Sequence, residues 1–571
     1  MSQTLPDTID EFMSWDWDQI EPLAQELVDQ EITDVATWLA EWTRLAWYVY
    51  ERAARLHVAS TLDTADEEAE ETLRRYVETV YQPLSRYNDK LNRKLLAVDD
   101  LPEGYEVALR TIQAEIDLFC EENIPLLVDE YQCGLNYNRI IGLQTVTWNG
   151  EEVTITQLSG IAAQLERPKR EEAWRLGSQR VLEDREAINA NWIEVLKLRQ
   201  QIAQNAGYDS YRDYAWLMRG RFDYTPADSE TFHAAIEKIV VPAAARVYER
   251  FREQLGVDTL RPWDLNVNPM RATDIDLDPL GRPALTPFAD VDTLVAKVQI
   301  VFDSVDPELG AYFKLMEQNQ MLDLANTRGK APGAYCTTYP ITGSPFIFMN
   351  AVGKHNDLQT MLHESGHAFH AFETLNLPYL HQRDYPLEFA EVASMAMELL
   401  AAPYLETFYT PEDAARARIE HLQGILLFWP YMAVVDAFQH WAYTHVEEAL
   451  DPNNCDAKWA ELWQRFIVGV DYTGLEEDMK TGWHRKQHIH RSPFYYIEYG
   501  LAQLGAVQVW ANSLENQTAA LTAYRQALSL GGTAKLPDLY SAAGARLAFD
   551  ADTLNQAVDL VETTIHGLGQ V

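Results

Sequence analysis

The feature that most constrains the fold is an apolar segment that contains two histidines four positions apart. The pentapeptide His363-Glu364-Ser365-Gly366-His367 is surrounded by apolar residues: Leu358, Met361, Leu362, Ala368, Phe369, Ala371 and Phe372. This apolar content is typical of a buried helix, on which residues i and i+4 share one face. Burying two imidazoles without partners costs free energy. The segment therefore predicts either two histidines that share a ligand or two core histidines bonded to neighbouring carbonyl groups.

A zinc ion is the shared ligand that this spacing favours. Two imidazoles on one helix face reach a single zinc ion at the usual ligand distance. Glu364 then lies beside the open coordination position, where it can take a proton from zinc-bound water, whose pKa falls to roughly 7. The H-E-x-x-H pattern occurs by chance in on the order of a few per cent of chains this long. The pentapeptide alone therefore suggests a catalytic zinc site without establishing one.

A catalytic zinc also needs a third protein ligand and an open fourth position. Four carboxylates follow the pentapeptide: Glu373, Glu388, Glu391 and Glu398. Pro386 precedes a predicted helix, so Glu388 lies in its first turn, where the helix dipole favours a carboxylate without a metal. Glu391 lies one turn further among apolar residues, where an unpaired charge is costly. We therefore predict that His363, His367 and Glu391 bind one zinc ion.

Two residues near these ligands have open interpretations. Glu398 lies seven positions after Glu391 on the same helix face, so it either orients a ligand or is solvated at the surface. His370 lies seven positions after His363 and returns to the face of the motif. It is either a residue behind the ligands or on the substrate side, or an ordinary core histidine.

Helical periodicity over most of the chain predicts a mainly α fold. The segments with this pattern are rich in Ala, Leu, Glu, Arg and Gln: Val35 to His57, Ala65 to Leu96, Glu166 to Ala206, Ser229 to Leu255 and Val291 to Gln318. The segment Thr145 to Ile155, with Asn149-Gly150 at its centre, predicts an isolated β-hairpin. Ala334 to Tyr339 and Phe346 to Asn350 predict a small β-sheet next to the helix of the pentapeptide.

The length of 571 residues exceeds the size at which one hydrophobic core usually stops growing, so two lobes or one large domain are expected. We predict an N-terminal helical region in residues 1–200 that forms much of one lobe. The catalytic region with the zinc site follows in residues 201–571. This boundary is soft, and the lobes are expected to interleave in the sequence. Five prolines from Leu260 to Pro287 mark a second candidate boundary.

The predicted strand at Phe346 to Asn350 has two interpretations. If its edge faces a cleft, its backbone can pair with an extended peptide, which gives affinity without reading side chains. Phe348 and Met349 are then candidate substrate-binding residues. The alternative is an ordinary buried strand.

The charge balance disfavours several classes of partner. The chain has 46 Lys and Arg against 87 Asp and Glu, a formal net charge of −41. Nucleic acid and anionic membranes are therefore excluded as expected partners, because both need a basic surface. The acidity would concentrate cationic peptides near the protein, but it also fits plain solubility or a salty habitat.

The cysteines and the apolar segments indicate the compartment. Four cysteines occur, far apart in the sequence, which is typical of a reduced compartment. Residues 1–19 contain no basic region followed by an apolar run, so we predict no secretory signal. The longest apolar stretch, Ile425 to Phe438, is too short to span a bilayer. A cytoplasmic location is the prediction.

Hydrogen-bond donors gather further along the chain, between Gly482 and Gly500. This stretch contains three histidines and three tyrosines: His484, His488, His490, Tyr495, Tyr496 and Tyr499. Hydrolysis of a peptide bond builds negative charge on the carbonyl oxygen, which a tyrosine hydroxyl or a histidine N–H can stabilise. Tyr496 and Tyr499 share one helical face. The alternative is a set of core tyrosines with hydrogen-bonded hydroxyls.

These segments resemble the oligoendopeptidase F-like branch of the thimet oligopeptidase family of zinc metallopeptidases. The similarity runs from Arg328 to the C-terminus. Its carriers are the following segments: Gly329 to Cys336, Pro345 to Asn350, the metal pentapeptide, Phe389-Ala390-Glu391, Val435 to Trp441 and His488 to Gly500. Before Arg328 the chain resembles the family in its helical texture and in stretches such as Leu182 to Tyr214.

The resemblance implies a two-lobed helical molecule that encloses a deep central channel with zinc at its floor. It implies hydrolysis of internal bonds in short unstructured peptides, with Glu364 as the catalytic base. His488 and Tyr499 would hold the substrate carbonyl and its oxyanion, and Tyr496 would contact the peptide. Tyr495 and His490, together with His484, stay as competitors for these roles because relatives differ in their spacing.

Two other functions stay open at this point. One is a zinc carboxypeptidase that releases dipeptides from a free C-terminus, which would need a cation to pair the terminal carboxylate. The other is a catalytically inactive peptide-binding relative, which the presence of Glu364 beside a full ligand set disfavours. Cleavage preference and oligomeric state are not indicated by the sequence.

Overall fold

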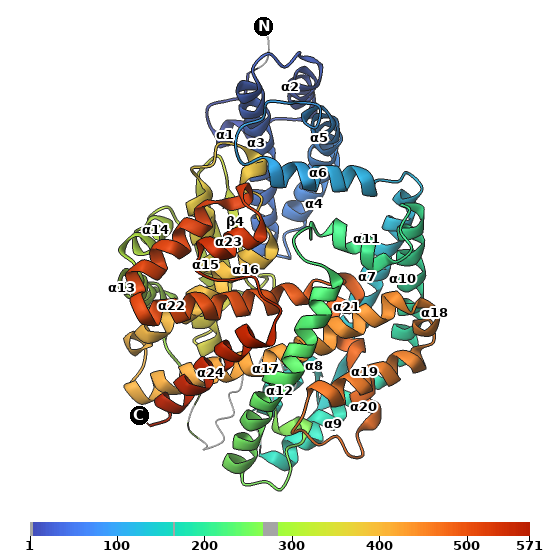
Figure 1. Ribbon diagram of the computed structural model, residues 1–571, viewed down its shortest axis with the longest axis vertical. Coiled ribbons are helices and arrows are strands. Elements are labelled where there is room, and N and C mark those ends of the chain that lie inside the picture. Colours follow the sequence, from blue (N-terminus) through green and yellow to red (C-terminus); the bar gives the residue numbers. More distant parts are fainter. Residues whose placement is uncertain (1–3, 164–165, 266–281, 283, 571) are drawn as a thin grey trace. The chain divides into compact units, whose positions relative to one another are not determined.

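A computed structural model describes residues 4–163, 166–265, 282 and 284–570 (Figure 1). Its contacts divide the chain into two compact units. The first unit contains residues 1–113, 286–409 and 505–547, and the second contains residues 114–285, 410–504 and 548–571. The predicted boundary at residue 200 falls inside a helix and stays a prediction. The proline-rich segment from Leu260 to Pro287 includes the crossing at Leu285/Thr286, although residues 266–281 and 283 within it lie outside the described residues.

The first unit contains most of the N-terminal helices and the larger sheet. Its elements are α1 (Ile9–Phe12), α2 (Trp17–Asp29), α3 (Val35–Leu62), α4 (Glu67–Tyr76), α5 (Gln82–Leu95), α13 (Val291–Val305), α14 (Pro307–Gln318), β3 (Leu322–Ala325), β4 (Tyr335–Tyr339), β5 (Ser344–Ala351), α15 (His355–Thr374), α16 (Leu387–Ala401) and α23 (Leu536–Ala542). Helices α6 (Glu106–Leu118) and α22 (Tyr496–Ser529) contribute residues to both units.

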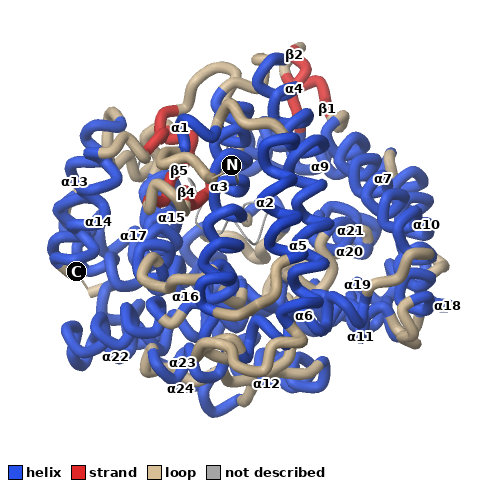
Figure 2. Tube along the Cα trace, turned by 90° about the horizontal axis from the view of Figure 1, so that it is seen from above, coloured by secondary structure: helices blue, strands red, loops and turns tan. Residues whose placement is uncertain are grey.

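Among the described residues of the second unit, the regular elements are helices and one hairpin. Its elements are α7 (Asn123–Gly142), β1 (Thr145–Trp148), β2 (Glu151–Thr154), α8 (Ile155–Ala163), α9 (Arg167–Glu183), α10 (Arg185–Asn205), α11 (Tyr211–Met218), α12 (Pro226–Leu255), α17 (Pro411–Thr444), α18 (Val446–Ala449), α19 (Pro452–Phe466), α20 (Glu476–Lys480), α21 (Gln487–Arg491) and α24 (Ala551–Leu568). Helices dominate the trace, and the strands gather in two small groups (Figure 2). The prediction of a mainly α fold is confirmed.

The predicted hairpin is present in the second unit. Strands β1 and β2 pair antiparallel, with Trp148 opposite Glu151. The two residues between them, Asn149 and Gly150, have φ values of 53° and 89°. Positive φ at both positions is what a tight two-residue hairpin turn requires, and Asn and Gly adopt it at little cost.

The sheet in the first unit has the order β3-β5-β4. Strand β3 runs parallel to β5, and β4 runs antiparallel to it. The buried ammonium group of Lys330 donates hydrogen bonds to the carbonyl oxygens of Ala325 on β3 and Met349 on β5, at 2.8 and 2.6 Å. Helix α15 packs against β4 and β5. A small sheet therefore lies next to this helix, as the sequence predicts.

Helices α15 and α16 pack unusually closely because α15 contains a glycine at the contact. A Cβ atom on Gly366 would lie 2.5 Å from the Cα of Ser394 and 2.6 Å from the carbonyl oxygen of Ala393, both on α16. Real Cβ atoms do not approach other atoms this closely. The absence of a side chain at Gly366 thus sets the distance between the two helices.

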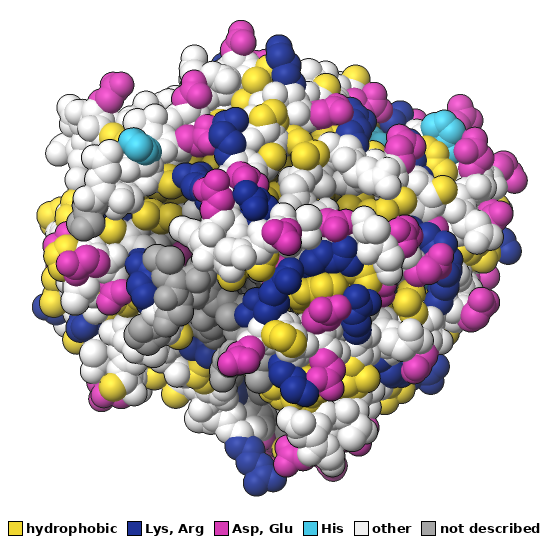
Figure 3. All heavy atoms as spheres, turned by 90° about the horizontal axis from the view of Figure 1, so that it is seen from below, with side chains coloured by type: hydrophobic (Ala, Val, Ile, Leu, Met, Phe, Trp, Pro, Cys, Tyr) yellow, Lys and Arg dark blue, Asp and Glu magenta, His cyan; other side chains and the backbone are white. Residues whose placement is uncertain are grey.

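The surface and the thiols bear on the predictions about partners and compartment. On the face drawn in Figure 3, Lys and Arg side chains stand beside Asp and Glu side chains, with apolar side chains between them. In the part of the chain that the structure describes, no helix is both long and apolar enough to cross a membrane. The four cysteines are free thiols. A cytoplasmic location stays a prediction.

Gly366→Ala should lower stability by about 1–3 kcal/mol, because the added methyl group forces α15 and α16 apart. The matched control is Gly567→Ala in α24, where a Cβ atom meets nothing within 4 Å. That substitution should stabilise the chain by up to about 1 kcal/mol, since alanine favours a helix. Urea unfolding measures both variants. Equal midpoints for the two would contradict the close helix contact.

Candidate metal centre

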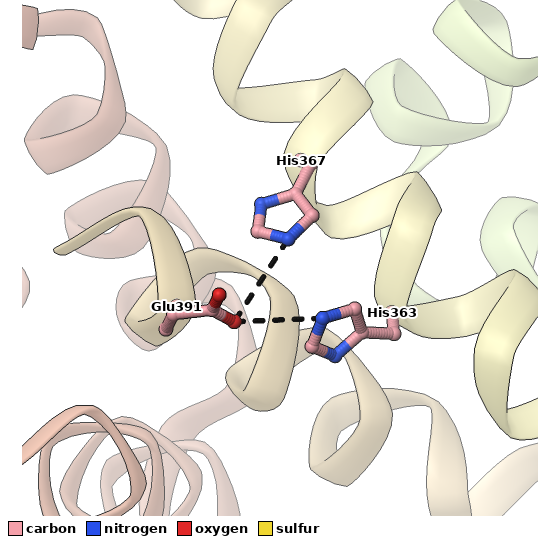
Figure 4. Close-up of side chains that lie close together, drawn as sticks. All are labelled: His363, His367 and Glu391. Carbon is pink, nitrogen blue, oxygen red and sulfur yellow. Dashed lines mark ion pairs between the residues drawn. The ribbon is translucent and has the colours of Figure 1, made fainter. Parts of the chain in front are cut away.

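His363, His367 and Glu391 point toward one another from α15 and α16 (Figure 4). Oε2 of Glu391 lies 3.5 Å from Nε2 of His363 and 3.9 Å from Nε2 of His367. One ligand atom from each residue lies within 4.8 Å of the other two. The two imidazole rings are nearly perpendicular, at 87°, with centroids 4.9 Å apart. The structure thus brings together the three residues that the sequence predicts as ligands.

The donor set fits one zinc ion. Zinc–nitrogen and zinc–oxygen bonds are about 2.0–2.2 Å, so tetrahedral ligand atoms lie roughly 3.3–3.6 Å apart. The distances from Glu391 to the two imidazoles are 3.5 and 3.9 Å, close to that range. Many catalytic zinc sites have this ligand set: two imidazoles, one carboxylate and a fourth position left for water.

Two residues of α16 orient these ligands. Nδ1 of His363 donates a hydrogen bond to Oε1 of Glu398 at 2.8 Å, which leaves Nε2 free to bind a metal. The hydroxyl of Ser394 donates to Oε2 of Glu391 at 3.0 Å. Of the two interpretations of Glu398, the structure favours the orienting role. Ser394 was not predicted from the sequence, although it lies three residues after Glu391, on the same helix face.

The two imidazoles differ in their affinity for a proton. Burial lowers the pKa of His363, but the hydrogen bond to Glu398 and the charge of Glu391 outweigh burial and raise it to about 9. Burial and the charge of His363 hold the pKa of His367 well below its usual value. A metal therefore has to displace a proton from His363, while His367 is already neutral.

Glu364 has the properties of a group that exchanges protons. It is buried on α15, between the two histidines in sequence. Burial raises the pKa of its carboxyl group to about 7, His363 lowers it, and Glu391 and Glu398 raise it further. The backbone N–H of Cys336 on β4 also lowers this pKa. A carboxyl group that titrates near neutrality can both accept and return a proton.

His370 lies in the core. Its side chain is fully buried, and its ring stacks on Tyr385 with centroids 3.6 Å apart. Burial lowers its pKa to about 3. Neither ring nitrogen has a hydrogen-bond partner within the described part of the chain. Of the alternatives left open by the sequence, a core histidine matches this environment.

Phe348 and Met349 lie on β5, which is the central strand of its sheet and not an edge. Both side chains are buried, and the ring of Phe348 stacks on Tyr335 at 4.8 Å. Among the described residues, β4 is an edge strand of this sheet, and it carries Cys336. Substrate contacts by Phe348 and Met349 stay a prediction.

The predicted donor cluster is assembled in the second unit. His488 on α21 packs against the rings of Tyr495, Tyr496 and Tyr499, with centroids 5.8, 5.0 and 6.3 Å away. Burial, together with the charges of Lys486 and Arg219, lowers the pKa of His488 to about 3, so its imidazole is neutral. The Tyr496 hydroxyl and Nδ1 of His488 are buried without a hydrogen-bond partner among the described residues.

The other two histidines of this stretch belong to the core of the second unit. His490 is buried between aromatic rings and stacks on Tyr137 with centroids 4.2 Å apart. Nε2 of His484, also buried, lies 2.8 Å from Oδ1 of Asn189. The structure groups His488 with the three tyrosines and places these two histidines elsewhere. A substrate-binding role of His490 stays a prediction.

The ammonium group of Lys486 lies 3.7 Å from the ring centroid of Tyr496, beneath the donor cluster. Burial lowers the pKa of Lys486 to about 7. The ring of Tyr431 on α17 also lies 5.3 Å from this ammonium group, a contact between distant parts of the sequence. No local sequence pattern predicts the contact between Lys486 and Tyr431.

The sequence matches a known family and several named relatives. The model of Peptidase family M3 matches residues 162–558, more than half of the 571 residues. Oligopeptidase PepF of Bacillus subtilis (strain 168) is 25% identical over 230 residues, which are 40% of this chain and 34% of that protein. The chromosomal oligoendopeptidase F of Lactococcus lactis subsp. cremoris is 24% identical over 285 residues, 48% of this chain and 45% of that protein. These matches span between a third and a half of the relatives' length.

The fold matches solved structures over nearly its whole length. PZ peptidase A with inhibitor 2 has a TM-score of 0.84 at 26% identity, and the match covers 97% of each chain. Oligoendopeptidase-F from Enterococcus faecium has a TM-score of 0.62 at 18% identity, which shows the fold alone. Sequence and structure agree with the resemblance noted from the motifs. The chain therefore belongs to Peptidase family M3, in its oligoendopeptidase F-like branch.

Proposed function

We propose that this peptidase is a zinc-dependent oligoendopeptidase that hydrolyses internal bonds of short unstructured peptides. The observation that carries the proposal is the convergence of His363, His367 and Glu391 beside the buried carboxyl group of Glu364. A zinc ion held by these three side chains would lower the pKa of a water molecule and polarise the substrate carbonyl. No nucleic acid or membrane takes part, and the expected partners are oligopeptides.

The remaining steps are assigned to side chains of this chain. Glu364 takes a proton from the attacking water and delivers it to the leaving amine, which its near-neutral pKa permits. Glu398 holds His363 in the orientation that presents Nε2 to the metal. His488 and Tyr499 donate hydrogen bonds to the carbonyl oxygen as negative charge develops, and Tyr496 contacts the peptide. Among the described residues, Nδ1 of His488 and the hydroxyl of Tyr496 have no hydrogen-bond partner, which supports donor roles in this cluster.

The endopeptidase assignment is tested with an internally quenched peptide blocked at both ends and a matched peptide with free ends. Each is incubated with and without a zinc chelator. Chelator-sensitive cleavage of the blocked peptide supports the proposal. Cleavage of the free-ended peptide alone indicates an exopeptidase, and no cleavage of either indicates an inactive peptide-binding protein.

Glu364→Gln should reduce kcat by at least about 10³-fold, because the amide cannot take a proton from water. The zinc content should stay at one per chain, since Glu364 is not a ligand. Elemental analysis and peptide cleavage on the same sample measure both quantities. Turnover within tenfold of the wild type would contradict the role of Glu364 as base.

Glu391→Ala should release zinc during dialysis, because two imidazoles alone hold the ion weakly. Glu388→Ala is the matched control: it removes a second buried carboxylate from the same helix, one turn earlier. The control should retain its zinc. Full zinc content in Glu391→Ala, or equal loss in both variants, would refute the ligand assignment.

His488→Phe should lower kcat/KM by about 10²-fold, since one donor to the developing oxyanion is lost. The loss should be the same at pH 6 and pH 8, because the pKa of His488 lies near 3 and the imidazole is neutral at both values. His488→Gln, which keeps an N–H donor, should recover part of the activity. A loss that changes strongly between pH 6 and pH 8 would show that an ionised imidazole acts instead.

A further inference from the structure

The turn between α21 and α22 has a backbone conformation that its sequence does not favour. Phe494 has a φ of +62°. Among the described residues, the other non-glycine positions with positive φ are Asn149 in the hairpin turn and Gln320 just after α14. Both are exposed polar or turn positions. A buried phenylalanine in the left-handed region is strained, and such strain persists only where the surroundings over-determine the conformation.

A glutamine on α17 holds this residue in place. The backbone N–H of Phe494 donates a hydrogen bond to Oε1 of Gln439 at 2.8 Å. Gln439 is fully buried, and its Nε2 donates to the carbonyl oxygen of Val435 at 3.1 Å, which fixes its orientation. The ring of Phe494 packs edge-on against His440, with centroids 5.3 Å apart. The segment Val435 to Trp441, singled out in the sequence, thus supports this turn.

Two arginines bind the carbonyl oxygens of the same turn. Arg219 donates through Nε to the carbonyl oxygen of Pro493 at 2.8 Å and lies 3.3 Å from the carboxylate of Glu498. Arg221 donates to the carbonyl oxygen of Phe494 and to Glu498, the latter at 2.7 Å. All three charged side chains are largely buried, so their charge-assisted bonds are strong and directional. Both arginines come from one short turn after α11.

The residues that these arginines bind lie next to the donor cluster in the sequence. Glu498 lies in the first turn of α22, between Tyr496 and Tyr499 in the sequence. The guanidinium of Arg219 also lies over the ring of Tyr495, 5.2 Å from its centroid. Fixing Pro493, Phe494 and Glu498 sets both the start of α22 and the rotation of its first turn. That rotation decides where the tyrosine hydroxyls point.

We propose that Arg219, Arg221 and Gln439 are positioning residues that fix the donor cluster for catalysis. They hold the strained Phe494 turn and the first turn of α22, and through these the hydroxyl of Tyr499 and the imidazole of His488. The contacts described above run to the turn and to Glu498, and none runs to His363, His367 or Glu391. The proposal rests on the role of this cluster stated under Proposed function and adds the elements that keep it preorganised.

Arg219→Gln and Gln439→Met test the proposal in the zinc-loaded full-length protein. Gln439→Met removes the hydrogen bond to Phe494 while nearly keeping the side-chain volume, and Arg219→Gln removes the charge and shortens the side chain. Because a misplacement of about 1 Å can cost on the order of 10²-fold in rate, kcat should fall by about that factor. KM should change little, since an interaction made in the transition state is lost. Arg219→Lys, which keeps the charge but not the planar fork of donors, should recover part of the loss.

Arg261→Gln is the matched control in the same unit. Arg261 is as buried as Arg219: it pairs with Asp471 at 2.9 Å, donates to the carbonyl oxygen of Thr473 at 2.8 Å and lies over an aromatic ring, Trp263. It touches no residue of the donor cluster in these contacts. This variant should lose similar thermal stability and keep the wild-type kcat. An equal fall of kcat in Arg261→Gln and Arg219→Gln would overturn the proposal.

Hydrogen exchange gives a readout that does not need activity. Backbone N–H groups of residues 492–500 should exchange faster in Arg219→Gln and Gln439→Met than in the wild type, and not in Arg261→Gln. Unchanged exchange and unchanged kcat in the first two variants would overturn the proposal while leaving the proposed function intact. A wild-type chain without chelator-sensitive cleavage would overturn both.

Discussion

The close contact between α15 and α16 is the constraint on which the candidate metal centre depends. Because Gly366 has no side chain, the backbone of α16 at Ala393 and Ser394 lies directly against α15. This close contact between the helices brings Oε2 of Glu391 to 3.5 Å from Nε2 of His363. The fourth position of the pentapeptide, Gly366, is thus a packing requirement that brings Glu391 to the two histidines.

The same two helices also supply the charges that the site needs in order to be stable. His363 lies beside Glu391 and Glu398, and His367 lies beside Glu391, so both candidate ligand histidines have a carboxylate nearby. The sheet adds a polar backbone group, the N–H of Cys336, at the carboxylate of Glu364. In the second unit, backbone strain at Phe494 and buried charge on Arg221 and Glu498 lie next to His488 and the tyrosines.

Local patterns in the sequence predicted the features that depend on local physics. The Asn149-Gly150 hairpin, the mainly α fold and the convergence of Glu391 with the two histidines follow from turn chemistry, periodicity and the cost of a buried charge. The features that the sequence did not predict depend on contacts between residues that lie far apart in the chain. Nothing near Phe348 indicates that β5 is flanked on both sides, and nothing near His490 indicates that Tyr137, more than 300 positions earlier, stacks on it. Arg219 and Gln439 escaped notice for the same reason, since their partners lie far away in the sequence.

The central claim is that two helices place three side chains around one zinc ion. Anomalous X-ray diffraction at the zinc absorption edge, on crystals of the zinc-loaded protein, tests it most directly. The account predicts a single strong peak per chain, about 2.0–2.2 Å from Nε2 of His363, Nε2 of His367 and a carboxylate oxygen of Glu391. A peak bound by other side chains, or a site in which Glu391 is replaced by another carboxylate, would contradict the account.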